Sequence, residues 1–297
     1  MTELAHRDTD AHSDALPLGA DSLIWRYFGD NRMFLIGPRP GVLQLMLAEL
    51  GQGVQDHSVF FADTAARIKR SLPPIFRTVY GSDTENAGIQ VRDFHHDIKG
   101  ELPAAHAGGE EGRRYHALDP DTYFWAHATF LDQVFYFADT FVKRLTDAEK
   151  QQMYLESKTW YRRYGVSDRP MPATYADFEA YWQRMLDEVT IAHPSATYSV
   201  GYVTKGFPRP KGVSPILWKV LAPVLNPLVA FLTTGGMPPQ ARTTLRLPWT
   251  DRQERRYQRF AAFWRSRAVN AVWNTLPMSL RYNGIAQAGY AREAAAA

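Results

Sequence analysis

Along most of this chain, apolar residues recur at spacings of three and four, the repeat of one face of an α-helix. The clearest run follows Asp119-Pro120, where a capping acid and a proline at the first helical position begin a helix of about 25 residues. Thr146 and Glu149 form a capping box that begins the next helix, which extends to about residue 164. The same period predicts helices near residues 22–30, 40–50, 58–72, 84–99, 175–192, 214–234 and 250–274.

Strand-like alternation of apolar and polar residues is scarce, and 198–203 is the best short candidate. No internal repeat or linker separates the helices, so the sequence predicts an all-α fold with one large helical domain over residues 19–297. Residues 1–18 are polar and lack the apolar core of a secretory signal, and we expect a disordered tail there. Without an export signal, a cytoplasmic location is the expectation.

The chain contains no cysteine, and this restricts the chemistry that it can perform. Disulfides, cysteine-ligated zinc, iron–sulfur clusters, thiolate-ligated haem and a cysteine nucleophile are all excluded. A net charge of +3, without a basic patch interleaved with aromatic residues, argues against nucleic acid as the main partner. No P-loop, HExxH or GxSxG motif is present. With 45% hydrophobic and 13% aromatic residues, a large folded core is expected.

One apolar stretch, at 213–234, stands apart from the rest of the sequence. It is interrupted by Lys219, Pro223, Asn226 and Pro227, which argues against a membrane span. A buried helical hairpin is the first interpretation. A face that dips into a membrane surface, giving peripheral membrane contact, or that lines the entry for an apolar ligand stays open as the alternative.

Histidine supplies the most distinctive polar pattern, since five of the nine lie between residues 95 and 127. On the helix expected at 84–99, His95 falls on the apolar face, with Arg92 one turn before it and Lys99 one turn after it. His96 diverges from His95 by about 100° and is expected to face solvent or a neighbouring loop. His127 lies on the apolar stripe of the helix after Asp119. Taken singly, His95 and His127 also fit packed, hydrogen-bonded core histidines.

A second polar cluster lies upstream, where Arg67, Arg70 and Ser71 share one helical face at spacings of i, i+3 and i+4. Pro73-Pro74 is expected to end or kink this helix. Two guanidinium groups and a hydroxyl on one face suit an anionic or oxygen-bearing ligand. An arginine face that pairs with nearby acids is the alternative.

Three segments between residues 67 and 128 carry motifs in a fixed order. The first reads Arg67-Ile-Lys-Arg70-Ser71-Leu72, followed by Val79-Tyr80-Gly81. The second reads Arg92-Asp-Phe-His95-His-Asp-Ile98-Lys-Gly100. The third reads Tyr115-His-Ala-Leu-Asp119-Pro120, followed by Trp125-Ala-His127-Ala128. In register, they resemble the R-L-x-x-T-L, R-x-x-H-x-x-[VI]-x-G and Y-x-A-x-D-P…W-x-H-A motifs of the MpaB-type oxygenases and latex-clearing proteins (rubber oxygenases).

The resemblance implies a globin-like packing of helices around a buried pocket for haem b, with His95 as the axial iron ligand. It further implies an oxygenase whose partners are O2 and an apolar, isoprenoid-like or lipid-like substrate. Rubber oxygenases cleave carbon–carbon double bonds of isoprenoid chains. By the same resemblance, the residues that contact the cofactor would be Arg92, Lys99 and Trp125, and those on the catalytic side would be Arg67, Arg70, Ser71 and His127.

One position departs from the family pattern, because Arg70 stands where rubber oxygenases have a lysine that reaches the distal side of the iron. A guanidinium stays protonated and donates no lone pair, so we expect a five-coordinate iron or a different distal group. Two alternatives remain open. One is a non-haem metal enzyme that uses His95 and His127 with Asp119 or Asp97, and the other is a helical lipid or isoprenoid carrier without redox chemistry.

Overall fold

A computed structural model describes residues 15–106, 112–210 and 212–296, and almost all of its regular structure is helical. One antiparallel hairpin, β1 (Lys99–Glu101) with β2 (Arg114–His116), is the sheet found in that part of the chain. The prediction of an all-α fold with one helical domain is therefore confirmed. The tail expected over residues 1–18 falls mostly outside the described residues, and at its end Leu16 N donates a 3.1 Å hydrogen bond to Leu155 O.

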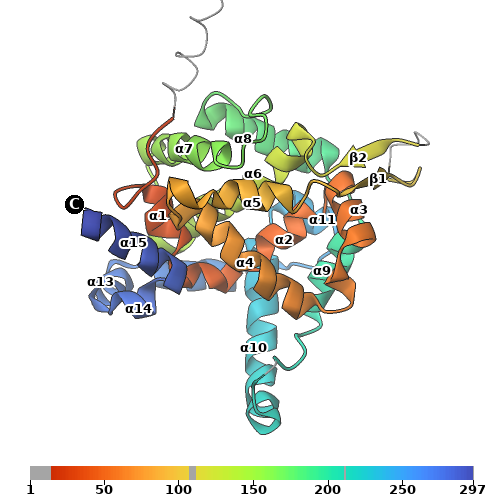
Figure 1. Cartoon of the computed structure of the whole chain (residues 1–297). Helices are drawn as coiled ribbons and strands as arrows, with labels where there is room; N and C mark the ends of the chain where they lie inside the picture. Colours follow the sequence, from red (N-terminus) through yellow and green to blue (C-terminus); the bar gives the residue numbers. More distant parts are fainter. Residues whose placement is uncertain (1–14, 107–111, 211, 297) are drawn as a thin grey trace, which may run out of the picture.

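The predicted site residues lie on α4 (Thr64–Tyr80), on α5 (Ala87–Asp93) and the turns after it, on β1 and on α6 (Pro120–Phe137), and Figure 1 shows how these elements are arranged. The α-helices of the first half are α1 (Leu23–Phe28), α2 (Arg39–Gln44), α3 (Ala48–His57), α4 (Thr64–Tyr80), α5 (Ala87–Asp93), α6 (Pro120–Phe137) and α7 (Asp147–Arg162). Those of the second half are α8 (Tyr175–Arg184), α9 (Pro194–Thr204), α10 (Pro215–Gly236), α11 (Pro239–Thr244), α12 (Asp251–Arg265), α13 (Arg267–Thr275), α14 (Met278–Arg281) and α15 (Gly284–Ala296). Short 3₁₀ segments η1 (Asn31–Ile36), η2 (Val59–Phe61) and η3 (Asp83–Glu85), and π-helical turns η4 (Ala138–Val142) and η5 (Met185–Val189), extend or connect them.

The predicted helix starts are confirmed by their caps. Asp119 accepts hydrogen bonds from the backbone of Asp121 and Thr122 at the start of α6. Thr146 and Glu149 form the expected capping box of α7. Each such cap satisfies amide groups that the first helical turn leaves without partners, and stabilises the helix by about 1 kcal/mol.

Helix α6 is the central element of the core, and it is buried on almost every face. Trp125 and Trp160 are fully buried, and the Trp125 ring stacks on Trp182 with a centroid separation of 5.1 Å. Burial of each such side chain stabilises the fold by about 1.5–3 kcal/mol. Many of the aromatic side chains of this sequence thus pack in the core around α6.

The strand expected at 198–203 is wrong, because this segment forms helix α9. His193 caps α9 and Pro194 occupies its first turn, so the backbone begins in a helical conformation. Ala196, Val200 and Val203 are then buried at a helical spacing, and their contacts override the local β-propensity.

Pro73-Pro74, which were expected to end or kink this helix, do not end it, since α4 continues through both prolines to Tyr80. Each proline removes one helical hydrogen bond and costs about 3 kcal/mol in a helix interior. The turns beyond them bury Phe76, Val79 and Tyr80, and that burial offsets the cost.

The helix expected at 84–99 is shorter than predicted, because α5 ends at Asp93. His95 therefore lies in the turns between α5 and β1, where its backbone N–H donates to Arg92 O at 2.9 Å. Pairing of Lys99 with His116 draws the chain into the extended hairpin and ends the helical path. Gly100 makes the pairing possible, since a Cβ there would meet the Tyr115 ring at 2.8–3.0 Å.

The buried hairpin expected at 213–234 is wrong as well. The segment is part of a single helix, α10, and within it only Leu232–Gly236 are buried. Asn226, within this helix, accepts a 3.3 Å hydrogen bond from Phe207 N in the preceding loop. In Figure 1 the amino-terminal part of α10 projects away from the other helices.

Candidate functional site

The imidazole of His95 is held in one orientation by the backbone of α5. Its Nδ1 lies 2.7 Å from the carbonyl oxygen of Val91, one turn earlier. A carbonyl only accepts, so Nδ1 carries the proton and the lone pair of a neutral ring lies on Nε2. Burial lowers the pKa of His95, and the nearby charge of Arg67 lowers it further. His95 is thus a neutral imidazole with a fixed tautomer, the state in which histidine ligates a metal.

Arg67 approaches this histidine from α4. Its side chain is half-buried, and its Nε donates a 3.2 Å hydrogen bond to Ser58 Oγ. Burial lowers the pKa of the Arg67 guanidinium, and the adjacent charge of Arg70 acts in the same direction. Ser71 Oγ donates to the Arg67 carbonyl at 2.8 Å, while the Arg70 side chain is exposed. The charge of Arg67 thus acts on His95, whereas Arg70 lies at the surface.

Tyr123, on the first turn of α6, covers another side of His95. The two rings meet edge to face with centroids 6.0 Å apart. The Tyr123 hydroxyl is buried and has no hydrogen-bond partner within the described residues. Burial also raises the pKa of this phenol far above its usual value, so it keeps its proton. An unpaired buried hydroxyl costs about 1–3 kcal/mol, which makes it a position where a further polar group could be accommodated.

Tyr123 belongs to an aromatic cluster whose other members are Trp160, Tyr161 and Tyr164. The ring of Tyr164 lies 5.3 Å from Tyr123, and that of Tyr161 lies 6.3 Å away. Trp160 and Tyr161 lie on α7 and Tyr164 follows its end, and all three belong to the sequence Trp160-Tyr-Arg-Arg-Tyr164, which the sequence patterns did not indicate. The spacing of 160, 161 and 164 on one face of a helix was the signal that could have identified them.

His127 lies at the far side of this aromatic cluster and is 3% exposed. Its ring centroid is 4.7 Å from Trp160 and 5.0 Å from Tyr161, and its Nδ1 has no partner among the described residues. Burial lowers its pKa to about 3, so the ring is neutral at pH 7. The tyrosines of the aromatic cluster stand between His95 and His127, and only ring contacts connect the two histidines.

The remaining predicted residues lie around this centre. Arg92 forms a 2.7 Å ion pair with Asp93. Trp125 donates from Nε1 to Leu43 O at 3.2 Å inside the core. Lys99 is exposed on β1. The structure therefore gathers His95, Arg67 and the aromatic cluster, and gives Arg92, Lys99 and Trp125 partners or positions of their own.

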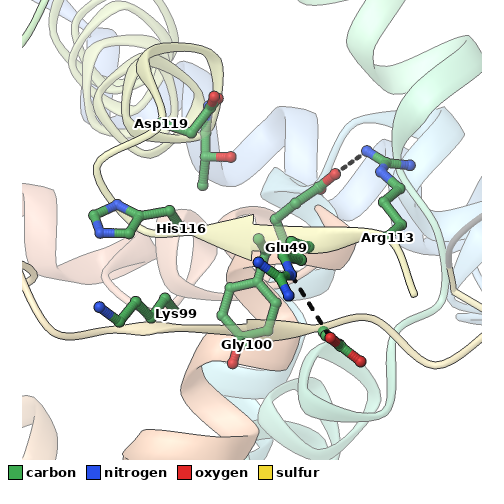
Figure 2. A pocket seen from close by; sticks show the side chains of 10 residues that line it. Glu49, Lys99, Gly100, Arg113, His116 and Asp119 are labelled. Carbon is green, nitrogen blue, oxygen red and sulfur yellow. Dashed lines mark hydrogen bonds and ion pairs between the residues drawn. The ribbon is translucent and has the colours of Figure 1, made fainter.

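Lys99 instead lines an open cavity of about 650 Å³ over the β1–β2 hairpin. Figure 2 shows Lys99 and His116 on one side of it and the ion pair of Arg113 with Glu49 on the other. Both signs of charge line this cavity, and neither His95 nor Arg67 is among its lining residues. Its lining mixes charged side chains of both signs with apolar surface, unlike the predominantly apolar pockets that bind most small molecules.

The donor set around His95 can be tested against the two kinds of iron site. Within the described residues, no three His, Asp or Glu side chains are placed to hold a metal ion together. Asp119 caps α6, and His127 is separated from His95, so the non-haem arrangement has no support in the geometry. A haem needs one protein ligand, since the macrocycle supplies the other donors. His95, with its fixed tautomer, fits that requirement.

Comparison with known proteins identifies the family of this chain. The family described as "ER-bound oxygenase mpaB/B'/Rubber oxygenase, catalytic domain" matches residues 25–266. Uncharacterised proteins of Mycobacterium bovis and Mycobacterium tuberculosis are each 27% identical over 225 residues, covering 73% of this chain and 81% of theirs. No solved structure is significantly similar. Because the match spans most of the chain and includes α4, α5, α6 and α7, this protein belongs to the family of MpaB-type and rubber oxygenase catalytic domains.

Proposed function

We propose that this protein is a haem b-dependent oxygenase that acts with O2 on an apolar, isoprenoid-like or lipid-like substrate, and that His95 holds the iron. The observation that carries the proposal is the 2.7 Å contact between His95 Nδ1 and Val91 O, which leaves the Nε2 lone pair available. Membership of the oxygenase family supports the reaction class.

A bound haem would supply the one-electron and O2 chemistry that amino-acid side chains lack. The residues of this chain would hold and orient it. Val91 fixes the His95 ring, and its carbonyl increases the basicity of the imidazole. Arg67 would place a positive charge toward an anionic or oxygen-bearing group, because it is the cation whose charge already lowers the pKa of His95.

The side chains around His95 would also control water and protons. The aromatic cluster is apolar and largely buried, so it excludes water from the side of His95 that faces α6 and α7. The Tyr123 hydroxyl retains its proton and has no other partner in the described residues, so it could donate to a polar group beside His95. Arg70 is exposed, and we propose that it is not an iron ligand.

The test is the visible spectrum of the purified protein after reconstitution with haem. We expect a Soret band and one haem per chain, and we expect His95→Ala to lose most of the bound haem. His96→Ala is the matched control, because His96 is adjacent, exposed and paired with Asp97. A Soret band unchanged in His95→Ala, or an equal loss in both variants, would contradict the assignment of His95.

A carrier without redox chemistry is the second proposal, and the exposed apolar surface of α10 favours it. In that case the purified protein would be colourless, would not bind added haem and would retain extracted lipid. Lipid analysis of a preparation that fails to bind haem decides between the two functions.

A further inference from the structure

The amino-terminal three quarters of α10 form an apolar surface without a partner in the described chain. Ile216, Val220 and Val224 are 79%, 68% and 67% exposed, and their i, i+4, i+8 spacing aligns them along one side of the helix. Leu217, Leu221, Leu225 and Leu228 are also exposed, at 37–50%. Of the described helices, α10 alone has the length and apolarity of a membrane span, with a mean hydropathy of 1.7 and 11% of its apolar window buried. A continuous apolar patch of this kind marks an interaction site.

The charge of the surrounding sequence identifies the partner. Residues 189–250 contain six Lys or Arg and no Asp or Glu, a net charge of +6. The whole chain has a net charge of +3, so the remaining residues carry −3. Lys205, Arg209 and Lys219 are exposed around the projecting end of α10. An apolar helix within an acid-free basic segment complements a surface that has apolar chains below and negative headgroups above.

We infer that α10 docks this protein onto the surface of an anionic lipid bilayer. The helix lies in the plane of the interface, with the stripe of Ile216, Val220 and Val224 among the acyl chains and the cations at the level of the lipid phosphates. A second copy of this chain is the less favourable partner, because two α10 helices side by side would bring like charges together.

The geometry of α10 opposes a full crossing. Its last five residues, Leu232–Gly236, are buried, and Phe231 packs on Trp249 with centroids 5.3 Å apart. The 17 residues from 215 to 231 then rise about 25 Å, which is shorter than the roughly 30 Å hydrocarbon layer. Insertion end-on would also carry Lys219 into the acyl region. A shallow position along the surface avoids both costs.

The docked helix α10 would lie next to α9, the helix that precedes it in the chain. Helix α9 continues into the loop that packs against Asn226 of α10. At the other end of this connection, the Tyr198 hydroxyl lies 3.3 Å from Thr64 Oγ1, one turn before Arg67 on α4. Docking itself does not depend on the proposed oxygenase reaction.

The first test is flotation of the purified full-length protein with vesicles of phosphatidylcholine, with and without about 30% phosphatidylglycerol. We expect binding to the anionic vesicles, weakened in 0.5 M NaCl by about tenfold or more because salt screens the cations. Loss of the apolar stripe should reduce binding about tenfold or more. Loss of three exposed apolar residues elsewhere, the control, should change binding less than about twofold. The stripe variant is Ile216→Ser/Val220→Ser/Val224→Ser and the control variant is Phe263→Ser/Val272→Ser/Leu280→Ser.

The cations are tested in the same assay. Each Lys or Arg near an anionic surface strengthens binding by about fivefold, so removal of three should weaken it at least about tenfold. Removal of three exposed arginines on α12 should have little effect, because they lie outside the acid-free segment. The two variants are Lys205→Gln/Arg209→Gln/Lys219→Gln and Arg252→Gln/Arg255→Gln/Arg259→Gln.

Because the chain has no cysteine, a single introduced thiol can report on the environment of α10. Val224→Cys labelled with the fluorophore NBD should brighten and shift to the blue on anionic vesicles, whereas labelled Val272→Cys should not. The inference is overturned if the wild-type protein does not float, if the stripe variant floats as well as wild type, or if the NBD spectrum is unchanged. Light scattering that shows a dimer, lost in the stripe variant, would overturn it in favour of a second copy.

Discussion

At the scale of single residues, His127 is a buried base that the fold keeps neutral. Its ring lies among Phe124, Trp160, Tyr161 and Tyr164. No described acid pairs with it, so the charged imidazolium would lose its hydration without gaining an ion pair in exchange. Burial of His127 therefore makes the free energy of unfolding depend on pH, independently of any role of this side chain in a reaction.

The pKa of His127 falls from 6.5 in the unfolded chain to about 3 in the fold. Below pH 6.5 the unfolded chain binds the proton more readily, so stability is full above that pH and is lost toward pH 3. Between pH 7 and pH 5 we expect a loss of about 2 kcal/mol in the free energy of unfolding from this group. His127→Phe should be less sensitive to acid by that amount in urea titrations at the two pH values.

Comparison of wild type with His127→Phe isolates the contribution of His127 to acid sensitivity, because the contribution of another buried histidine is the same in both proteins. Burial lowers the pKa of His193 to about 4, and this adds a similar dependence on pH. Equal acid sensitivity in wild type and His127→Phe would show that His127 is already charged or solvated in the fold.

At the scale of elements, α5 is positioned by its close approach to the end of α7. Gly88 lies against the backbone of Arg163, so that a Cβ would overlap the Arg163 carbonyl group. Arg163 in turn donates from Nη1 to Val79 O at 2.8 Å, at the end of α4. Helices α4, α5 and α7 thus meet at one point, and α5 carries the carbonyl of Val91 that holds His95.

Gly88→Ala should therefore separate α5 from α7 and disturb the His95 ring. We expect a loss of about 1–3 kcal/mol in stability, together with weaker binding of haem. Gly201→Ala is the control, because no atom lies within 4 Å of its added methyl group, and it should raise stability by up to about 1 kcal/mol. Urea titration and haem titration of both variants check this, and a neutral Gly88→Ala would contradict the proposed close packing.

At the scale of the whole molecule, the last helix of the chain, α15, packs against the first, α1. Helix α15 lies beyond the family match, which ends at residue 266. Tyr290 packs on Trp25 with ring centroids 5.2 Å apart, and Arg292 donates to Tyr80 O at 2.6 Å. Figure 1 shows α15 beside α1. Both contacts cover the end of α4, so the C-terminal helix supports the element that carries Arg67.

Truncation after Asn283 should expose Trp25 and Tyr80 to solvent. We expect the free energy of unfolding to fall by about 3 kcal/mol or more, from lost apolar burial and lost hydrogen bonds. Truncation after Glu293 is the control, because it keeps Tyr290 and Arg292. Equal stability of the two truncated chains in urea would show that α15 does not support the core.

The sequence by itself determined the helical class, the helix starts at Asp119 and Thr146, and the motifs that identify the family. These features are local, because a cap or a period of 3.6 residues is decided within a few turns. Tertiary structure decided the course of the chain at 198–203, at Pro73-Pro74 and in α10.

The same division holds for the site. Sequence spacing indicated His95 and Arg67, but it placed His95 on a helix, whereas hairpin pairing of Lys99 with His116 ends that helix and turns the ring back onto Val91. The partners Tyr123 and Tyr164 come from α6 and from the end of α7, so only packing could bring them together. The apolar sequence of α10 likewise did not determine whether the helix is exposed, because burial depends on whether another element covers it.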